Sequence, residues 1–304
     1  MARVAERRLA YAGRMGLVLG AWRWMGRFRS DYAVGVGLLV LSAVTFSSAG
    51  LFVKGVVAGA WAVIFWRGVF AVLATGLWIT WAGRWQQNLR MGRMGWAVGV
   101  IGALGTSAFV PAFKLTSIAN VALIYAASPL IAALLAWATL GERPSRRTLI
   151  GAFGALAGVA IIMWGSLGQG SLIGDLLALC MTLAMAGVMV MYRARPETPS
   201  AGPSMLQTGF LIGPAFALGA PFDTSVSEIG ILAAFGVLFA LASITLAEGA
   251  KRVPAGQAAL LSSLETPLAP VLALLVLSEM PSGATILGGA VVFLAVLGSI
   301  EGER

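Results

Sequence analysis

The stretch Leu140-Gly-Glu-Arg-Pro-Ser-Arg-Arg-Thr-Leu-Ile-Gly151 is matched later in the chain by Leu277-Ser-Glu-Met-Pro-Ser-Gly-Ala-Thr-Ile-Leu-Gly288. Leu, Glu, Pro, Ser, Thr and Gly recur in register in the two copies. Each copy follows an apolar run that a proline interrupts, Pro129 before the first copy and Pro267 before the second. The second half of the chain therefore repeats the first half.

The composition predicts a membrane protein. Of the 304 residues, 59% are hydrophobic and 11% are charged, whereas soluble domains average roughly 45–50% and about 25%. A spanning helix needs about 20 apolar residues, so the chain has room for about ten spans with short connections. We predict an all-α integral membrane protein with spans near 32–53, 58–81, 95–113, 117–139, 147–164, 171–192, 204–220, 228–249, 254–277 and 284–300.

The basic residues predict the orientation of these spans. A net charge of +9 would suggest nucleic-acid binding in a soluble protein, but here the basic residues lie between apolar runs, and we expect no nucleic-acid partner. With the N-terminus in the cytoplasm, 18 of the 21 Lys and Arg fall in cytoplasmic segments. The positive-inside rule therefore predicts that both termini are cytoplasmic. Residues 1–31 are expected to form a basic cytoplasmic arm, and residues 301–304 a cytoplasmic tail.

The repeat and the charge count together predict an inverted architecture. Five spans in each half is an odd number, so the second half must enter the membrane upside down. The turn at Glu142 carries three arginines and lies on the cytoplasmic side, whereas its twin at Glu279 has lost them and lies outside. We expect two inverted five-helix repeats, 32–165 and 166–300, around a central cavity, an arrangement typical of secondary transporters.

Other function classes are disfavoured by what the sequence lacks. Histidine is absent and Cys180 is the single cysteine, so we expect neither a metal site nor a cofactor. No Gly-rich loop ends in Gly-Lys, which excludes the phosphate-binding loop of an ATP-driven pump within this chain. A membrane-embedded enzyme would need a nucleophile–base pair, and none is visible. A receptor or scaffold would have long loops or a soluble domain.

Three sets of residues, taken in order, resemble the drug/metabolite transporter superfamily, specifically the EamA-type permeases. They are Phe65-Trp66-Arg67, then Pro129-Leu130 with Leu140-Gly141-Glu142, and finally Glu265-Thr266-Pro267 with Leu277-Ser278-Glu279. The resemblance covers residues 32–300, and within the family the chain is most similar to the YddG-type exporters of aromatic and neutral amino acids. It implies a multi-pass protein of the bacterial inner (plasma) membrane, with a small-molecule substrate and efflux by rocking of the two halves.

Polar and aromatic residues inside the spans are the candidate cavity lining. Those at helical spacing on one face are the first candidates, although in membranes Ser and Thr often bond helix to helix instead. Prolines at matched positions of both halves predict kinks that act as hinges or border the site. The predicted cavity residues are Ser42, Phe46, Arg67, Trp78, Tyr125, Ser243, Ser263 and Glu265, and the predicted hinges are Pro129, Pro267 and Pro270.

Two ionisable residues deep within spans stand out, since charge there is costly and faces a partner or an aqueous path. Arg67 can receive a substrate carboxylate as a bidentate clamp, and Glu265 can receive an α-ammonium group or act as a protonatable coupling group. The alternative is that the two pair with each other or with backbone and only hold the fold. The sequence leaves proton antiport and facilitated diffusion open. A drug or sugar-nucleotide permease is the alternative within transport, although phosphates would call for more cations than Arg67.

Overall fold

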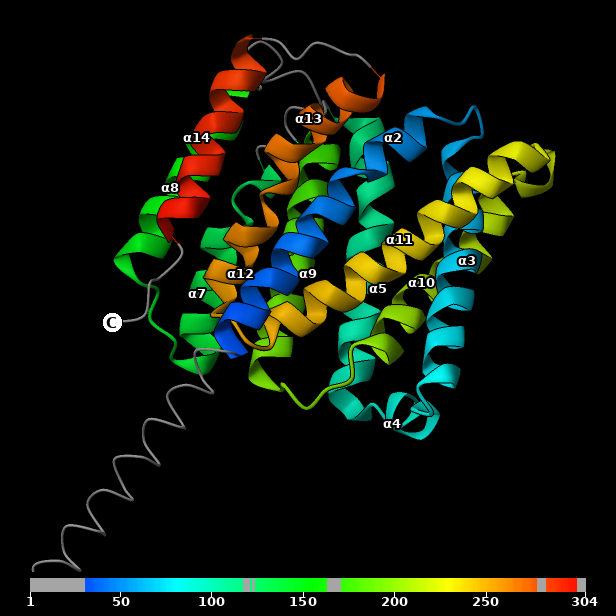
Figure 1. Ribbon diagram of the computed structural model, residues 1–304, viewed down its shortest axis with the longest axis horizontal. Coiled ribbons are helices and arrows are strands. Elements are labelled where there is room, and N and C mark those ends of the chain that lie inside the picture. The colour runs from blue at the N-terminus through cyan, green and yellow to red at the C-terminus, as the bar shows by residue number, and fades with distance from the viewer. Residues whose placement is uncertain (1–30, 117–120, 122–123, 163–170, 278–282, 300–304) are drawn as a thin grey trace, which may run out of the picture.

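The computed structural model describes residues 31–116, 121, 124–162, 171–277 and 283–299, and within these ranges every regular element is a helix (Figure 1). The predicted arm, except for Asp31, and the predicted tail lie outside the described residues. The same holds for residues 278–282, which form part of the second copy of the repeated turn.

The first half of the chain begins with a helix over Asp31–Ser47, which a turn at Ser48 separates from the next helix. Two differences from the predicted spans stand out: one helix starts three residues earlier, at Gly92, and a short helix lies between Trp85 and Leu89, where we expected a loop. The helices are α2 (Ala49–Lys54), α3 (Ala60–Trp81), α4 (Trp85–Leu89), α5 (Gly92–Leu115), α7 (Ser128–Leu140) and α8 (Arg146–Ile162).

In the second half, side-chain caps start two helices. Ser171 accepts a hydrogen bond from the Gly174 amide at the first of them, and Ser225 forms a capping box with Glu228 at the second, which satisfies amides that have no partner within the helix. The elements are α9 (Leu172–Ala194), α10 (Ala201–Leu218), the 3₁₀ helix η1 (Pro221–Asp223), α11 (Val226–Ala250), α12 (Ala255–Ser262), α13 (Glu265–Leu277) and α14 (Gly283–Ser299).

The described copy of the repeated turn ends α7 as its sequence predicts. Gly141 follows the last helical residue with a φ of 71°. This left-handed conformation favours glycine because a side chain would clash with the backbone. In the second copy Ser278 occupies the same position of the motif.

Two apolar spans are broken at matching places. Residues 126–127 form a turn before α7, and residues 263–264 form a turn between α12 and α13. Fifteen residues separate Ala127 from Glu142, and fifteen separate Leu264 from Glu279, so the breaks are in register with the repeated turn. A proline follows each break within the first turn of the new helix, where its missing N–H leaves no hydrogen bond unmade.

The breaks correct the expected local geometry of two prolines, whereas their role as hinges stays a prediction. Pro129 is the second residue of α7 and Pro267 is the third residue of α13, so both mark helix starts and not kinks inside a continuous helix. Pro270 lies further along α13.

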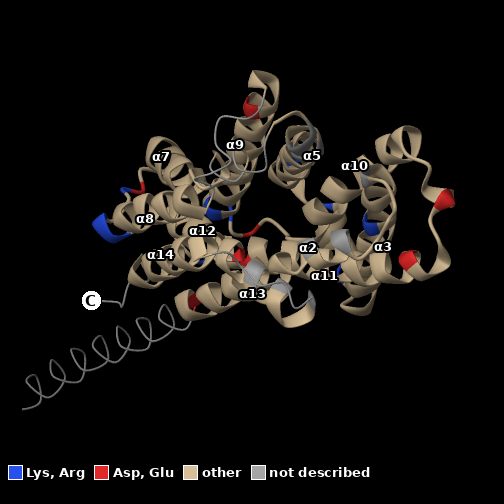
Figure 2. Ribbon diagram, turned by 90° about the horizontal axis from the view of Figure 1, so that it is seen from above, with Lys and Arg blue, Asp and Glu red and all other residues tan. Residues whose placement is uncertain are grey.

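The helices pack in two groups. In the first group, α9 lies against both α5 and α7. In the second group, the helix over Asp31–Ser47 lies against α11, where the Ser42 hydroxyl donates to the Ala242 carbonyl at 2.9 Å. In this group α2 contacts both α11 and α13, whereas α12 contacts α11 but lies mainly against α7 and α9 of the first group. Viewed from above, α5 and α9 lie on one side, and α2, α11 and α13 on the other (Figure 2).

Two further helix pairs lie at the edges of the bundle (Figure 1). α3 and α10 pair at one edge, and α8 and α14 at the other. The second pair approaches closely through glycines, because a Cβ added at Gly158 would lie 2.7 Å from the Gly288 carbonyl oxygen, and one added at Gly288 would meet the Gly158 carbonyl oxygen in turn. Small residues permit this backbone approach in membrane helices.

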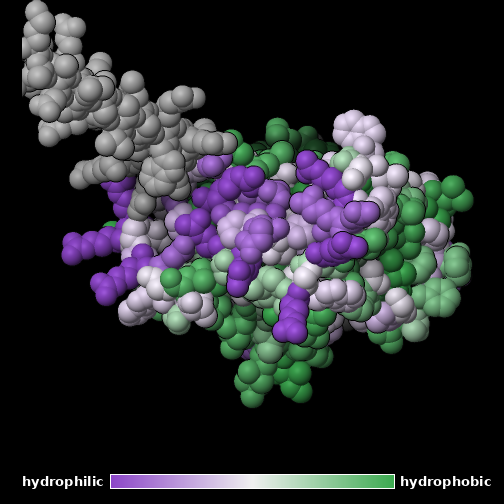
Figure 3. Space-filling model, turned by 90° about the horizontal axis from the view of Figure 1, so that it is seen from below, coloured by the Kyte–Doolittle hydropathy of each residue, from purple (hydrophilic) through white to green (hydrophobic). Residues whose placement is uncertain are grey.

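The connections gather charge at one end of the bundle. Contacts join Glu142 to Arg193, Arg193 to the Lys251 carbonyl, and Asn88 to Gly202, so the connections around these residues lie together. Seen from below, hydrophilic side chains gather on this face (Figure 3). We call it the basic end because its connections carry Arg84, Arg90, Arg93, Arg143, Arg146, Arg147, Arg193, Arg195, Lys251 and Arg252. At the opposite end Glu228 accepts from the Val57 and Ala58 amides, at 2.5 and 3.2 Å.

Length and apolar composition suit four helical stretches of the described chain for crossing a membrane. They are Trp61–Trp81, Leu172–Ala194, Val226–Ala250 and Ala255–Val276. The last one runs across the break between α12 and α13, so it is a discontinuous span.

Candidate functional site

The two broken spans meet at a hydrogen bond between Tyr125 and Glu265. Tyr125 precedes the break before α7, and Glu265 is the first residue of α13. The Tyr125 hydroxyl donates to the Glu265 carboxylate. Tyr125 packs in a cluster with Ala112 and Met181 of the first group, so this bond connects the first group of helices to the second.

Arg67 is held by aromatic rings instead of a carboxylate. Its guanidinium carbon lies 4.1 Å from the centroid of the Phe239 ring and 5.6 Å from that of Phe235. Its buried Nε atom has no hydrogen-bond partner, and within the described residues no carboxylate forms an ion pair with it. Cation–π contact stabilises a guanidinium but satisfies none of its N–H donors.

Within the described residues, Arg67 and Glu265 therefore do not pair with each other, which was one of the alternatives. Glu265 has Tyr125 as its partner, and Arg67 has the faces of two phenylalanines. A buried donor without an acceptor costs about 1–3 kcal/mol. The Arg67 Nε thus has free hydrogen-bonding capacity for an acceptor that the described residues do not provide.

Phe46 and Ser243 lie near Phe239, the ring that Arg67 faces. The Phe46 ring meets the Phe239 ring edge to face, with centroids 5.6 Å apart. Ser243 is one helical turn after Phe239 on α11 and therefore projects from the same face; it is half-buried. Phe46, Phe239 and Arg67 thus form one cluster, contributed by the helix over Asp31–Ser47, α11 and α3.

Three other predicted cavity residues have different surroundings. Ser42 is buried and bonds the Ala242 carbonyl, which joins two helices. Ser263 is buried and its hydroxyl bonds the Leu260 carbonyl of its own chain segment at 2.6 Å. Trp78 is 37% exposed and lies about 16 Å along α3 from Arg67, at 1.5 Å per residue. Within the described residues, the hydroxyls of Ser42 and Ser263 thus bond backbone carbonyls and neither Tyr125 nor Arg67.

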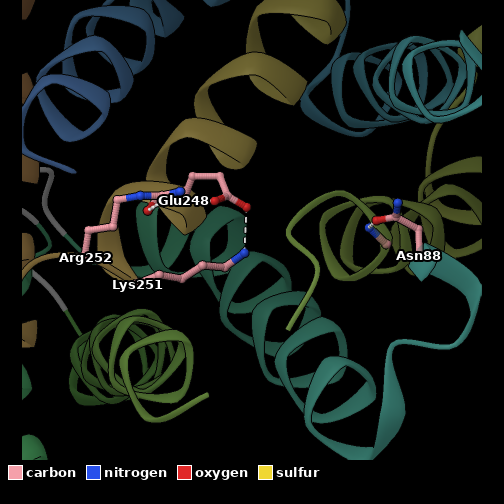
Figure 4. A network of polar contacts seen from close by, with 5 residues as sticks. Asn88, Glu248, Lys251 and Arg252 are labelled. Atoms are coloured by element: carbon pink, nitrogen blue, oxygen red, sulfur yellow. Dashed lines mark hydrogen bonds and ion pairs between the residues drawn. The ribbon is translucent and has the colours of Figure 1, made fainter. Parts of the chain in front are cut away.

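Sequence reasoning missed a polar cluster at the basic end. Glu248 near the end of α11 bonds Lys251 Nζ at 2.6 Å and Arg252 Nη1 at 2.8 Å, and Asn88 of α4 accepts from the Gly202 amide at 3.0 Å (Figure 4). The spacing of Glu248 to Lys251 and Arg252, three and four residues, was the signal available in the sequence, since such pairs face each other on a helix.

Metal ligands do not gather anywhere in the described ranges: no three His, Cys, Asp or Glu side chains come together as a metal site requires. The chemistry that the described site offers is recognition by one cation, one carboxylate and aromatic faces.

Comparison with known proteins gives evidence of the family to which this chain belongs. Among curated proteins, none matches this chain. One solved structure, described only as the crystal structure of a protein, superposes with a TM-score of 0.77 over 90% of this chain and 97% of that chain, at 19% sequence identity. At this identity the likeness shows a shared fold. The pattern of the EamA-like transporter family matches residues 33–164 and again residues 172–300. The chain is therefore a multi-pass membrane protein that belongs to the EamA-like transporter family.

Proposed function

We propose that this protein is a secondary transporter that exports small amphipathic metabolites, above all aromatic and other neutral amino acids, across the bacterial inner membrane. Family membership supports a small-molecule substrate. The observation that carries the narrower proposal is that Arg67 and Glu265 are not paired with each other. A zwitterionic amino acid presents a carboxylate and an ammonium group, and these match the two charges.

In this proposal each end of the amino acid has its own receptor. Arg67 binds the carboxylate, because its guanidinium offers two parallel donors and its Nε has no partner. Glu265 binds the ammonium group, which displaces the Tyr125 hydroxyl. The rings of Phe46 and Phe239, next to Arg67, pack against the apolar side chain of the substrate.

We further propose that the chain forms ten spans in two inverted repeats, 32–165 and 166–300, with both termini in the cytoplasm. Equivalent packing in the two halves supports this: α9 lies on α5 as the helix over Asp31–Ser47 lies on α11, and α7 lies on α12 as α8 lies on α14. The reciprocal approach of Gly158 and Gly288 is also what two-fold symmetry requires. The concentration of arginine at one end supports a cytoplasmic basic end.

A drug or other metabolite permease of the same fold is the second candidate, and it is equally consistent with family membership. A sugar nucleotide suits the site less well, since Arg67 is the only Lys or Arg in the interior of a predicted span and the phosphates carry several negative charges.

The test of this function is uptake of labelled phenylalanine, threonine and a sugar nucleotide into liposomes that contain the purified protein, with and without a pH gradient. Saturable flux of the amino acids is the expected result. Flux that a gradient does not change supports facilitated diffusion, and flux that a gradient drives, lost in Glu265→Gln, supports proton coupling by Glu265. Absence of amino-acid flux would overturn the proposed substrate class.

A further inference from the structure

The end of α11 carries an ionic cluster in which Glu248 bonds Lys251 and Arg252 (Figure 4). Lys251 is only 9% exposed. Its Nζ bonds the Glu248 carboxylate at 2.6 Å and lies 5.6 Å from the centroid of the Tyr192 ring on α9. Its carbonyl oxygen accepts from Arg193 Nη1 at 3.4 Å. The Ser200 hydroxyl, just before α10, bonds the Glu248 carboxylate.

Some of these contacts connect the second group of helices to the first group. Glu248 and Lys251 belong to α11 and the residue after it, in the second group, whereas Tyr192 and Arg193 belong to α9, in the first. Arg193 is itself held by Glu142, whose Oε1 lies 2.7 Å from its Nε. The cluster therefore fixes the basic end of the second group to the first group.

Apolar packing seals the same end. All eight residues of α12, Ala255–Ser262, are buried, and α12 lies against both α7 and α9. Gly256 approaches α7 so closely that an added Cβ would lie 2.8 Å from the Ala133 Cβ. The half of the broken span nearer the basic end is thus closed on the first group.

Among the described residues, the opposite end shows fewer contacts of this kind. The repeat relates the end of α9 to α2 and the end of α11 to the end of α5, so a symmetric molecule would pack α2 on α5. In the described chain α2 packs on α11 and α13 but makes no comparable contact with α5, and α5 and α2 stand apart when seen from above (Figure 2). Residues 265–269 of α13 are only half-buried.

We propose that the cluster of Glu248, Lys251, Tyr192, Arg193 and Ser200 is a latch that closes the basic end, and that the structure is the state in which the site opens toward the opposite end. This inference rests on the proposed transport by two alternating states. Breaking the latch favours the state open at the basic end, because the contacts of Lys251 with Tyr192 and Arg193 on α9 exist only while that end is closed.

The test measures access to a buried position behind the latch without any transport. Ala247 of α11 is 3% exposed and belongs to the same apolar cluster as Tyr192. The variant Ala247→Cys is made in a Cys180→Ser background, because the natural Cys180 is exposed and would also react. The rate at which a hydrophilic thiol reagent modifies the new cysteine is then measured in the purified protein. In Glu248→Gln we expect labelling about tenfold faster, the shift that a loss of about 1.4 kcal/mol produces.

The matched control is Glu197→Gln. Glu197 is an acid at the same end, but it is exposed and its 3.5 Å pair with Arg195 stays within one connection, so labelling keeps the parent rate. Ser200→Ala, which removes only the hydroxyl bond to Glu248, accelerates labelling to a smaller extent and serves if Glu248→Gln fails to fold. Unchanged labelling in the folded Glu248→Gln or Ser200→Ala protein overturns the latch. Because this assay needs no substrate, its outcome is independent of the transport assay.

Discussion

Tyr125 and Glu265 lie in opposite halves of the sequence, yet the hydroxyl of the first donates to the carboxylate of the second. The bond joins the residues next to two helix breaks that occupy equivalent positions in the repeats. Any relative movement of the two groups of helices must therefore strain or break it. In the proposed mechanism the ammonium group of the substrate replaces the Tyr125 hydroxyl at this point.

Removing the Tyr125 hydroxyl tests that competition. In Tyr125→Phe the Glu265 carboxylate loses a donor, and a hydrogen bond to a charged group contributes about 1.5–3 kcal/mol. A substrate ammonium then no longer displaces an existing bond, so we expect the KM for phenylalanine to fall by about tenfold in liposome transport. Tyr192→Phe keeps the ring that Lys251 faces and is expected to leave KM unchanged. A raised KM in Tyr125→Phe would contradict the competition.

The glycine contact between α8 and α14 predicts a stability effect. An added Cβ at Gly158 would lie 2.7 Å from the Gly288 carbonyl oxygen and from the Val292 side chain, so Gly158→Ala must push the helices apart. Overpacking of this kind costs about 1–3 kcal/mol, and we expect a lower melting temperature in detergent. Gly298→Ala is the control on the same helix pair, since nothing lies within 4 Å of its added Cβ. Equal melting temperatures for both variants would rule out the tight contact.

The basic end gives a prediction about orientation. Gly59, at the opposite end, is exposed and has open space for a side chain, and Glu197 at the basic end is also exposed. In a Cys180→Ser background, we expect a membrane-impermeant thiol reagent to label Gly59→Cys but not Glu197→Cys in intact cells, and both after the cells are opened. Labelling of Glu197→Cys alone in intact cells would show the reverse orientation.

The sequence was sufficient for the placement of helices, because apolar length and the repeated turn are local signals. Apart from the short helices α4 and η1, the helices of the described chain overlap the predicted spans, and Gly141 ends α7 as the turn implies. The repeat also indicated roughly where the helices break, since Pro129 and Pro267 occupy matched positions in the two halves and each lies next to a break. It could not say that Pro129 and Pro267 begin new helices, because a proline fits both a kink and a first turn.

The partners of Arg67 and Glu265 could not be predicted from the sequence, because they come from distant parts of the chain. The rings over Arg67 come from α11, and the partner of Glu265 comes from the other half of the chain, so neither has a spacing in the sequence that reveals it. Glu248 is the opposite case. Its pairs with Lys251 and Arg252 are local, but its contact with Ser200 depends on how the two groups of helices pack.

Recognition of the two ends of an amino acid by two separate residues is the central claim, and competition for labelled phenylalanine in liposomes tests it most directly. The competitors are phenylalanine, its amide, which lacks the carboxylate, and 3-phenylpropionate, which lacks the ammonium group. The unsubstituted protein should prefer phenylalanine to both. Arg67→Gln should lose only its discrimination against the amide, and Glu265→Gln only its discrimination against 3-phenylpropionate. If Arg67→Gln still rejects the amide as strongly as the unsubstituted protein does, Arg67 does not bind the carboxylate and the account is wrong.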